Sequence, residues 1–286
     1  MSILSNKIDF AVIISVQNAN PNGDPLNGNR PRETYDGYGE ISDVCIKRKI
    51  RNRLLDMGQP IFVQSEDKCN DACKSLKDRA DSVEELKKAK DRETYAKIAC
   101  EKWLDVRSFG QVFAFKDNDL SVGVRGPVSI HPAFSISPVD IASIQITKSV
   151  NSVTGDKKSS DTMGMKHTIP FGIYVFYGSI NCQLAEKTGF TDEDAERIHK
   201  ALETLFENDS SSARPDGSME VCKVYWWKHN CKSGQYPSAK VHRSLHITPI
   251  EGKKIPSGNL PFNLEDYYMI KVDALDGLKP EVYDGV

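Results

Sequence analysis

The order of elements that the sequence predicts indicates an α+β fold of the ferredoxin-like or RRM-like kind. A buried strand opens the chain and a helix follows it. An insertion then interrupts the core, and strands, a second helix and a further strand come after it. That order fits an α+β sandwich. The aromatic-glycine string that marks RRM sequences is absent, and we expect the rings of FGIYVFYG (residues 171–178) to lie in the core.

The first elements carry clear signals. The apolar and β-branched run Ile8–Val16 predicts a buried strand. A loop rich in Asn, Gly and Pro follows at Asn18–Arg32. A helix is expected next, because Ser42 can serve as its N-cap and Gly58 lies just past its C-terminus.

The rest of the chain alternates helical and extended segments. Residues 66–102 show helical periodicity and are interpreted as a helical insertion, which rejoins the core through a buried strand within Trp103–Phe115. Residues 148–168 form a polar stretch, which is typical of a functional projection or of disorder. Thr191 is expected to cap the second helix. Further strands are predicted at Ile144–Ile146, Phe171–Ile180, Met219–Trp227, Val241–Thr248 and Tyr267–Val272.

The composition is that of a globular protein. The chain has 286 residues, with 39% hydrophobic and 27% charged residues and a formal net charge of -2. No apolar run is long enough to span a bilayer, and the N-terminus has no charged leader or cleavage pattern of a signal peptide. We therefore expect a cytoplasmic protein without a membrane partner.

The cysteines do not indicate a metal site. Seven cysteines form no CxxC pair, and the close pair Cys69 and Cys73 has neither a second pair nor a flanking His. We expect reduced thiols, no metal and no cofactor.

Positive charge is concentrated in one short segment. Five of the seven positions from 47 to 53 are basic: Lys47, Arg48, Lys49, Arg51 and Arg53. A helical stripe of Val44, Ile46, Ile50, Leu54 and Leu55 would leave most of these charges on its flanks and outer face. Dense local charge in a balanced protein indicates a site for a polyanion, here nucleic acid, although a basic helix can also be only a solvated surface.

These segments carry a family resemblance. NANPNGDPLNGNRPR (18–32) followed by ISDVCIKRKIRNRLL (41–55), with RGPVSIHPAFS and DTMGMKHTIPFGIYVFYG further on, resembles the crRNA-binding backbone subunit (RAMP superfamily) of CRISPR type I surveillance complexes, in particular the type I-C Cascade. The resemblance implies an RRM-like palm with a helical finger insertion and a thumb hairpin. By position, the palm would be residues 1–62, 107–147 and 169–286, the finger 63–106 and the thumb 148–168.

The resemblance also implies a function. Copies would stack head to tail along CRISPR RNA, bind its backbone and present it for pairing with a target DNA strand in antiviral defence. The partners would include the RNA-processing subunit and the large subunit of Cascade. RNA contacts are expected at Asn18, Asn20, Asn22, Gly23, Asn27, Arg30, Arg32, the five basic residues of the helix, Arg125, Met163, Met165, Lys166 and His167. The two methionines would act as apolar wedges between bases.

Two other functions compete with this interpretation. A metal-independent endoribonuclease that processes CRISPR RNA precursors needs a general base and acid, and the six histidines are scattered along the sequence. Asp24 in the loop could cleave RNA, but aspartate is also a common turn residue. A sequence-specific DNA-binding regulator is disfavoured because no helix-turn-helix is predicted. We expect a non-catalytic scaffold.

Overall fold

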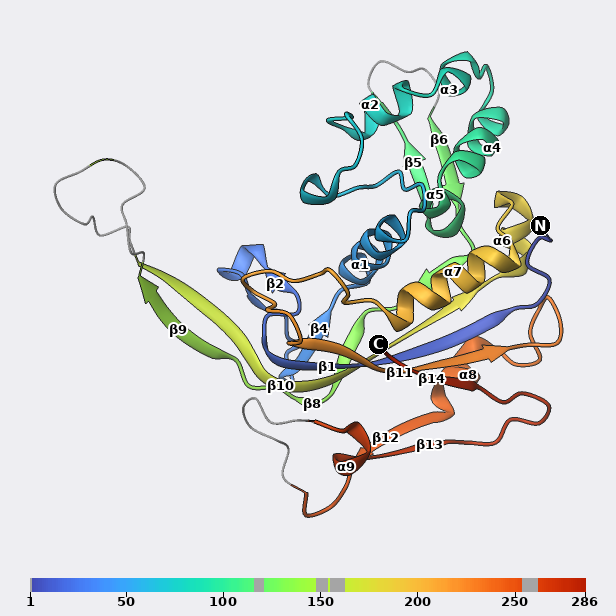
Figure 1. The fold of residues 1–286 in the computed structure, drawn as a ribbon. Helices are drawn as coiled ribbons and strands as arrows, with labels where there is room; N and C mark the ends of the chain where they lie inside the picture. Colours follow the sequence, from blue (N-terminus) through green and yellow to red (C-terminus); the bar gives the residue numbers. More distant parts are fainter. Residues whose placement is uncertain (1, 116–120, 148–153, 155–162, 254–261) are drawn as a thin grey trace.

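The core of the protein is one antiparallel sheet. A computed structural model describes residues 2–115, 121–147, 154, 163–253 and 262–286. Within them, the main path of the sheet runs β14-β11-β1-β10-β8-β4, and β7 also pairs with β10 (Figure 1). The strands are β1 (Ile8–Ala19), β4 (Tyr38–Ile41), β7 (Val128–Ile130), β8 (Ala133–Pro138), β10 (Met163–Ile180), β11 (Met219–Lys228) and β14 (Glu281–Asp284). The predicted mixture of helices with an antiparallel sheet is confirmed.

Strand β1 lies at the centre because both of its faces are apolar. It pairs with β10 on one side and with β11 on the other, both antiparallel. Phe10, Val12 and Ile14 belong to one buried cluster, whereas Ala11 and Ile13 belong to another on the opposite face. Such two-sided burial explains why the sequence here is a continuous apolar run rather than an alternating one.

Helices α1 (Asp43–Asp56) and α7 (Asp192–Glu203) pack against each other and help cover the first face of the sheet. Both begin as predicted. Ser42 accepts a hydrogen bond from the Cys45 backbone N–H, and Thr191 forms a capping box with Asp194. Val44 of α1 is exposed rather than part of the apolar stripe. The short helix α6 (Cys182–Thr188) precedes α7.

The second face is covered by C-terminal elements. These are α8 (Ser238–Arg243), β12 (Leu245–Pro249), α9 (Leu264–Tyr267) and β13 (Tyr268–Val272), with β12 and β13 forming their own two-stranded ribbon. The predicted strand Val241–Thr248 is therefore partly wrong, because its first residues end helix α8. No helix of the described residues is long and apolar enough to cross a bilayer.

A buried charge network ties this second layer to β1. Asp9 is fully buried and accepts a hydrogen bond from His229 Nε2 at 2.8 Å, and its carboxylate lies 2.9 Å from Lys7 Nζ. Burial alone would raise the pKa of Asp9, but the nearby His229, His242, Ser238 and Lys7 side chains outweigh burial and hold that pKa far below its usual range. Asp9 is therefore a carboxylate that stabilises the fold at neutral pH.

The helical insertion packs around its own small core. It comprises η2 (Glu66–Lys68), α2 (Leu76–Asp81), α3 (Glu84–Lys88), α4 (Arg92–Lys102), α5 (Leu104–Phe109), β5 (Gly110–Phe113) and β6 (Val122–Arg125). Phe62, Trp103, Phe113 and Val122 share its apolar cluster, so this packing unit extends past residue 106. The predicted strand in Trp103–Phe115 is wrong for its first half, because residues 104–109 are helical before β5 begins.

A long hairpin projects from the sheet. Strand β9 (Ala142–Thr147) pairs with the first six residues of β10, and the ribbon extends well beyond the body of the protein (Figure 1). The expected strand at Ile144–Ile146 is confirmed, and it forms one arm of this hairpin. Of the predicted thumb at 148–168, residues 148–153 and 155–162 lie outside the described residues.

Candidate nucleic-acid interface

The loop after β1 is tied together by asparagines. It contains β2 (Gly23–Asp24), η1 (Pro25–Asn27) and β3 (Arg30–Pro31). Asn20 is buried and donates from Nδ2 to the Asn29 carbonyl at 2.7 Å. Asn22 Oδ1 accepts from both the backbone N–H and the hydroxyl of Ser42 at 2.9 Å. These two asparagines shape the loop and fix it to the N-terminus of α1, whereas Asn18 and Asn27 are exposed.

Two loop glycines are required for different reasons. Gly28 has φ of +58°, which a side chain rarely adopts. Gly23 does not have a positive φ. A Cβ atom there would lie 2.0 Å from Asn29 Oδ1, so the constraint is the close approach of the loop to itself. The tight turn thus leaves residues 25–29 exposed at the tip of the loop.

Arg30 connects the loop to the projecting hairpin. Its Nη1 donates to Ser143 Oγ at 3.0 Å, and the Ser143 hydroxyl lies 2.8 Å from His167 Nδ1. Ser143 and His167 face each other across β9 and β10. The structure therefore brings together Arg30 and His167, two predicted site residues far apart in the sequence. The bridging Ser143 was not foreseen, because nothing in the sequence distinguishes it.

Arg32 and Asp24 interact within the loop. Arg32 Nη2 lies 3.5 Å from Asp24 Oδ1, and the same carboxylate oxygen accepts from the Leu26 backbone N–H at 3.2 Å. Asp24 thus caps the short 3-10 turn, which is the ordinary role of aspartate in a loop.

Most charges of helix α1 are paired with acidic side chains. Lys47 Nζ lies 2.9 Å from Asp43, and Arg51 Nε donates to Asp105 at 3.0 Å. Further pairs are Lys49 with Asp209 and Arg53 with Glu207. The partners at 105, 207 and 209 come from the insertion and from the segment after α7. The basic segment is therefore largely neutralised within the fold.

Lys49 does not lie on the outer surface of the helix as expected. Its side chain is 4% exposed, and its ammonium also lies 5.4 Å from the Phe206 ring centroid. Burial lowers the pKa of Lys49, while the Asp209 carboxylate opposes this change. The segment that connects α7 to β11 covers this part of α1, and the sequence of α1 alone could not show that.

Arg48 is the exposed charge of the segment. Among the described residues it has no ion pair or hydrogen bond, and it lines a polar pocket of about 200 Å³ with Arg214. Arg214 Nε donates to Asp209 at 3.3 Å, and the neighbouring Ala213 carbonyl accepts from the Asn20 backbone N–H at 2.9 Å. Nothing in the sequence indicates that Arg214, about 170 positions from Arg48, lines the same pocket. Lys68 also lines it.

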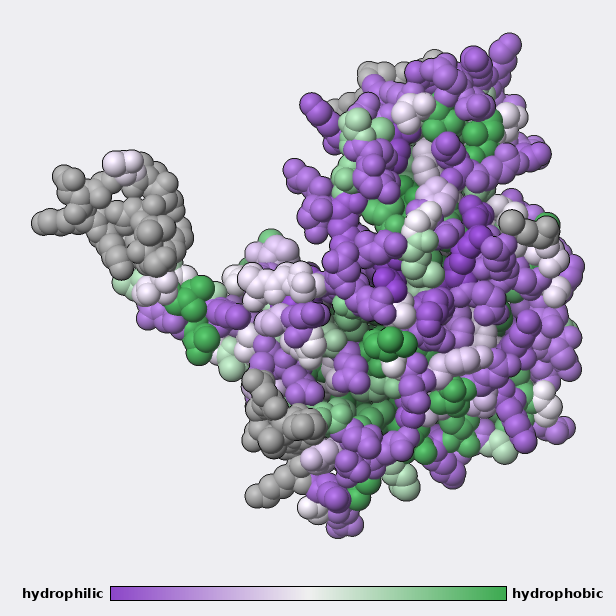
Figure 2. Space-filling model, viewed as in Figure 1, coloured by the Kyte–Doolittle hydropathy of each residue, from purple (hydrophilic) through white to green (hydrophobic). Residues whose placement is uncertain are grey.

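The hairpin exposes apolar side chains on both faces. Met163 and Met165 are 57% and 54% exposed and lie on the same face as His167. Lys166 lies on the other face, opposite Ile144. Figure 2 shows this hydrophobic patch on the hairpin, beyond a mostly hydrophilic surface. Exposed apolar side chains on a projecting ribbon indicate a contact with another molecule.

Arg125 is separate from the loop. It is exposed at the end of β6 and pairs with Gly110 of β5, within the hairpin that packs against the insertion helices (Figure 1). The structure therefore does not bring Arg125 together with the loop and the projecting hairpin.

The histidines lie in several parts of the fold, and two of them are neighbours: the ring centroids of His131 and His242 are 5.6 Å apart. His199 and His229 are buried in the fold, and His242 Nε2 donates to the Gly178 carbonyl at 3.1 Å. His246 is exposed and pairs with Asp273 at 2.8 Å. Within the described ranges, no group of three or more His, Cys, Asp or Glu could hold a metal ion.

The fold and the site define an α+β protein that combines an exposed loop, a polar pocket and a projecting ribbon with exposed apolar side chains. The sequence model of the family described as CRISPR-associated protein Cas7 matches residues 6–273. The chain belongs to this family.

A curated relative and two solved structures are similar to the chain. The CRISPR-associated protein Cas7 of Haloferax volcanii is 28% identical over 225 residues, which cover 72% of this chain and 66% of that protein. A chain of a CRISPR RNA-guided surveillance complex in a pre-nicking state aligns with a TM-score of 0.48 and 14% identity, over 77% of this chain and 78% of that one. A second surveillance complex gives 0.46 and 15%, over 77% and 68%.

Proposed function

We propose that this protein is a backbone subunit of a CRISPR surveillance complex of type I-C. Copies of it bind the backbone of CRISPR RNA, stack head to tail along it and present the RNA for pairing with a target DNA strand. The observation that carries the proposal is the Arg30–Ser143–His167 connection, since it holds a cationic loop against a ribbon with exposed methionines. Membership of the Cas7 family supports the same assignment.

The strand order supports a ferredoxin-like palm. The order β11-β1-β10-β8 corresponds to the fourth, first, third and second strands of that fold, with α1 and α7 as its two helices. In this assignment the insertion around Trp103 and Phe113 is the finger, and the β9–β10 hairpin is the thumb.

The charged residues divide into two groups in this proposal. Arg30, Arg48 and Arg214 are accessible enough to meet phosphates, and planar guanidinium groups suit that contact. Lys49 and Arg51 instead hold α1 against Asp209 and Asp105, and their side chains are only 4% and 14% exposed, whereas that of Arg214 is 27% exposed. The RNA would therefore follow the loop and the polar pocket rather than the length of the helix.

The methionines would act as wedges. Met163 and Met165 project from the same face as His167, so an RNA strand held by Arg30 and His167 would meet them directly. A side chain inserted between two bases separates them at a modest energy cost. The bases on either side would then be splayed for pairing with DNA.

The role is proposed to be non-catalytic. His167 is the histidine that lies beside the RNA-binding loop in the described parts of the chain, and its Nδ1 is already bonded to the Ser143 hydroxyl. An endoribonuclease would need that imidazole as a general base or acid. His167→Ala should therefore leave the bound RNA intact and uncut, as in the wild-type protein.

Salt-dependent RNA binding tests the proposal. The affinity of a single copy for a short polyuridine RNA would be measured by fluorescence anisotropy over a range of salt concentrations. Each phosphate contact removed should lower the slope of log K against log salt by about 0.7 to 0.9. Arg48→Ala and Arg214→Ala should each do so, with similar losses on RNAs of other sequence.

Arg243→Ala is the matched control. Arg243 is an exposed arginine at the end of α8, on the opposite face of the sheet from α1. Arg243→Ala changes the net charge by the same amount as the other two substitutions, but it should leave the slope of log K against log salt unchanged. Equal effects of all three substitutions would mean that only net charge matters, and the assigned RNA path would be wrong.

A further inference from the structure

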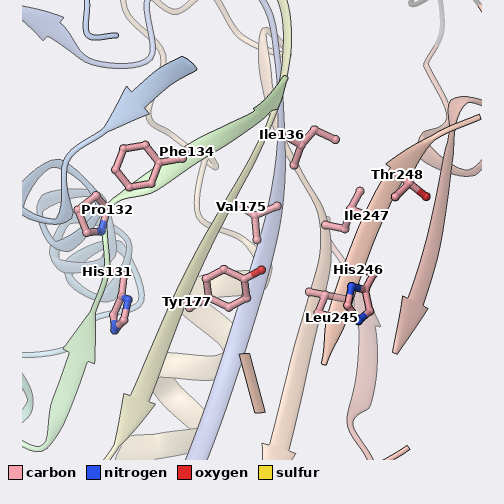
Figure 3. Close-up of a pocket in the computed structure, with 10 residues that line it drawn as sticks. All are labelled: His131, Pro132, Phe134, Ile136, Val175, Tyr177, Leu245, His246, Ile247 and Thr248. Atoms are coloured by element: carbon pink, nitrogen blue, oxygen red, sulfur yellow. The ribbon is translucent and has the colours of Figure 1, made fainter. Parts of the chain in front are cut away.

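The second face of the sheet carries an apolar groove that the proposed RNA path does not use. Its volume is about 460 Å³, and it lies between the sheet and strand β12 (Figure 3). Phe134, Ile136, Val175 and Tyr177 of β8 and β10 contribute its floor. Leu245, His246, Ile247 and Thr248 of β12 form its wall. Four consecutive residues in a strand can line one groove only if the edge of that strand faces it.

The edge of β12 that faces the groove has unpaired backbone groups. Hydrogen bonds from the Asp273 N–H to the Ser244 carbonyl and from the Ile250 N–H to the Tyr267 carbonyl set the register of the β12–β13 ribbon. In an antiparallel pair every second residue bonds to the partner strand, so Leu245 and Ile247 direct their backbone N–H and C=O away from β13. No described residue pairs with those groups. An open edge above an apolar floor is a site for an added β-strand.

Strand β9 has the matching properties. All six of its residues are exposed, and within the described residues it pairs only with β10. Ile144 and Ile146 are 55% and 46% exposed and lie on the face opposite the methionines. Lys166 shares that face, and its long stem allows the ammonium to remain at the rim of a groove. The strand thus offers a free edge and two apolar side chains at alternate positions.

We propose that the groove receives strand β9 of a second copy of this protein. The strand adds to the edge of β12 and places Ile144 and Ile146 on the floor around Phe134 and Val175. The six residues of β9 and the five of β12 match in length, at about 3.3 Å per residue. The proposal rests on the proposed function, in which copies stack head to tail, and it identifies the surface that joins them.

The geometry excludes pairing within one copy. Ile146 lies opposite Gly164, and Val175 lies eleven residues further along the same strand β10. At about 3.3 Å per residue, the donor and acceptor surfaces lie up to about 36 Å apart. The contact uses two different surfaces of the same chain, so it is heterologous and propagates from copy to copy unless it is capped.

Two variants test the pairing from opposite sides. Ile144→Asp with Ile146→Asp removes the donor face but leaves the groove intact. Ile247→Pro removes an outward N–H from the acceptor edge, where proline is tolerated because β13 does not use that group. Ile247→Ala is the matched control, since it shortens the side chain but keeps the N–H. Phe134→Asp, at a 43% exposed floor residue, is a second acceptor variant should the proline variant unfold.

Assembly is measured by mass photometry, with and without a long polyuridine RNA. For each variant alone, the protein concentration needed for assembly should rise by about tenfold or more. A mixture of donor and acceptor variants should form one-to-one dimers that do not grow, because only one functional pair of surfaces remains. Ile247→Ala should retain most of the assembly.

The outcomes separate this proposal from the proposed function. Wild-type assembly by either variant, or a mixture that stays monomeric although each variant binds short RNA, would overturn the groove as the docking site. That second result would leave RNA binding by single copies in place. A wild-type protein that does not bind RNA would instead refute the proposed function, and the dimer test without RNA would still decide on the groove.

Discussion

Two neighbouring basic residues of α1 are predicted to have opposite roles. Lys49 is buried against Asp209, whereas Arg48 is exposed in the polar pocket. Lys49→Met should therefore destabilise the fold with little effect on RNA binding, and Arg48→Ala should weaken RNA binding without affecting the fold.

The structure sets the magnitude of the first effect. Removing one partner of a buried ion pair costs about 3 to 5 kcal/mol, because the remaining charge is left without compensation. In Lys49→Met, Asp209 would still have Arg214 Nε as a partner at 3.3 Å, and its side chain is 14% exposed, so the remaining charge is partly compensated. We therefore expect Lys49→Met to lower the free energy of unfolding by about 2 to 3 kcal/mol. For Arg48→Ala, which removes no ion pair or hydrogen bond of the described structure, the change should stay within about 0.5 kcal/mol.

Urea denaturation and RNA titration together check the pair. Lys49→Met should move the urea midpoint down by about 1 M, while the salt slope of RNA binding by the folded protein stays as in the wild type. Lys49→Met combined with Asp209→Asn should recover part of the lost stability, because the uncompensated carboxylate is gone. A stable Lys49→Met protein with a reduced salt slope would show that Lys49 meets phosphate directly and that the reasoning from burial is wrong.

Three further substitutions follow from the contacts. Asp9→Asn should lower the free energy of unfolding by about 2 kcal/mol at neutral pH. A carboxylate with a depressed pKa stabilises the fold less as the pH falls below about 4, so the difference in urea midpoint between Asp9→Asn and the wild type should become smaller towards pH 3. Asp105→Ala should cost about 3 kcal/mol and expose the insertion to limited proteolysis, since its carboxylate accepts from the Phe62 N–H at 2.7 Å and from Arg51. Ser143→Ala should weaken RNA affinity about threefold in anisotropy titrations, because Arg30 loses the hydrogen bond that positions it. The urea midpoint of the protein should stay unchanged.

The sequence predicted correctly those elements that are determined by residues close together in the chain. The caps at Ser42 and Thr191 and the apolar run of β1 each depend on residues within a few positions, and the structure contains all three. The strand prediction was wrong for residues 104–109 because the structure of that segment depends on distant contacts. Its aromatic and β-branched residues favour a strand, but Asp105 is held in place by the backbone of Phe62 and by Arg51, and the helix ends only at Gly110 with φ of +81°.

The candidate site was predicted unevenly for a similar reason. Charge density is a property of the sequence, but exposure is a property of the fold. Lys49 and Arg51 are paired with acids 160 and 54 positions away, and no pattern in residues 41–57 indicates those partners. The loop, in contrast, was recognised from its Asn, Gly and Pro content, because those residues fix its backbone directly.

The hairpin shows how one element can serve both parts of the proposed assembly. Its alternating side chains place Met163 and Met165 on one face and Ile144 and Ile146 on the other. In the proposed arrangement the methionine face meets RNA while the isoleucine face and the free edge of β9 meet a neighbouring copy. Each copy that docks would thus fix the ribbon through which it holds RNA, and RNA bound to the ribbon would favour the next docking step. Cooperative assembly along RNA then follows from the two-residue period of a β-strand, without any conformational change in the palm.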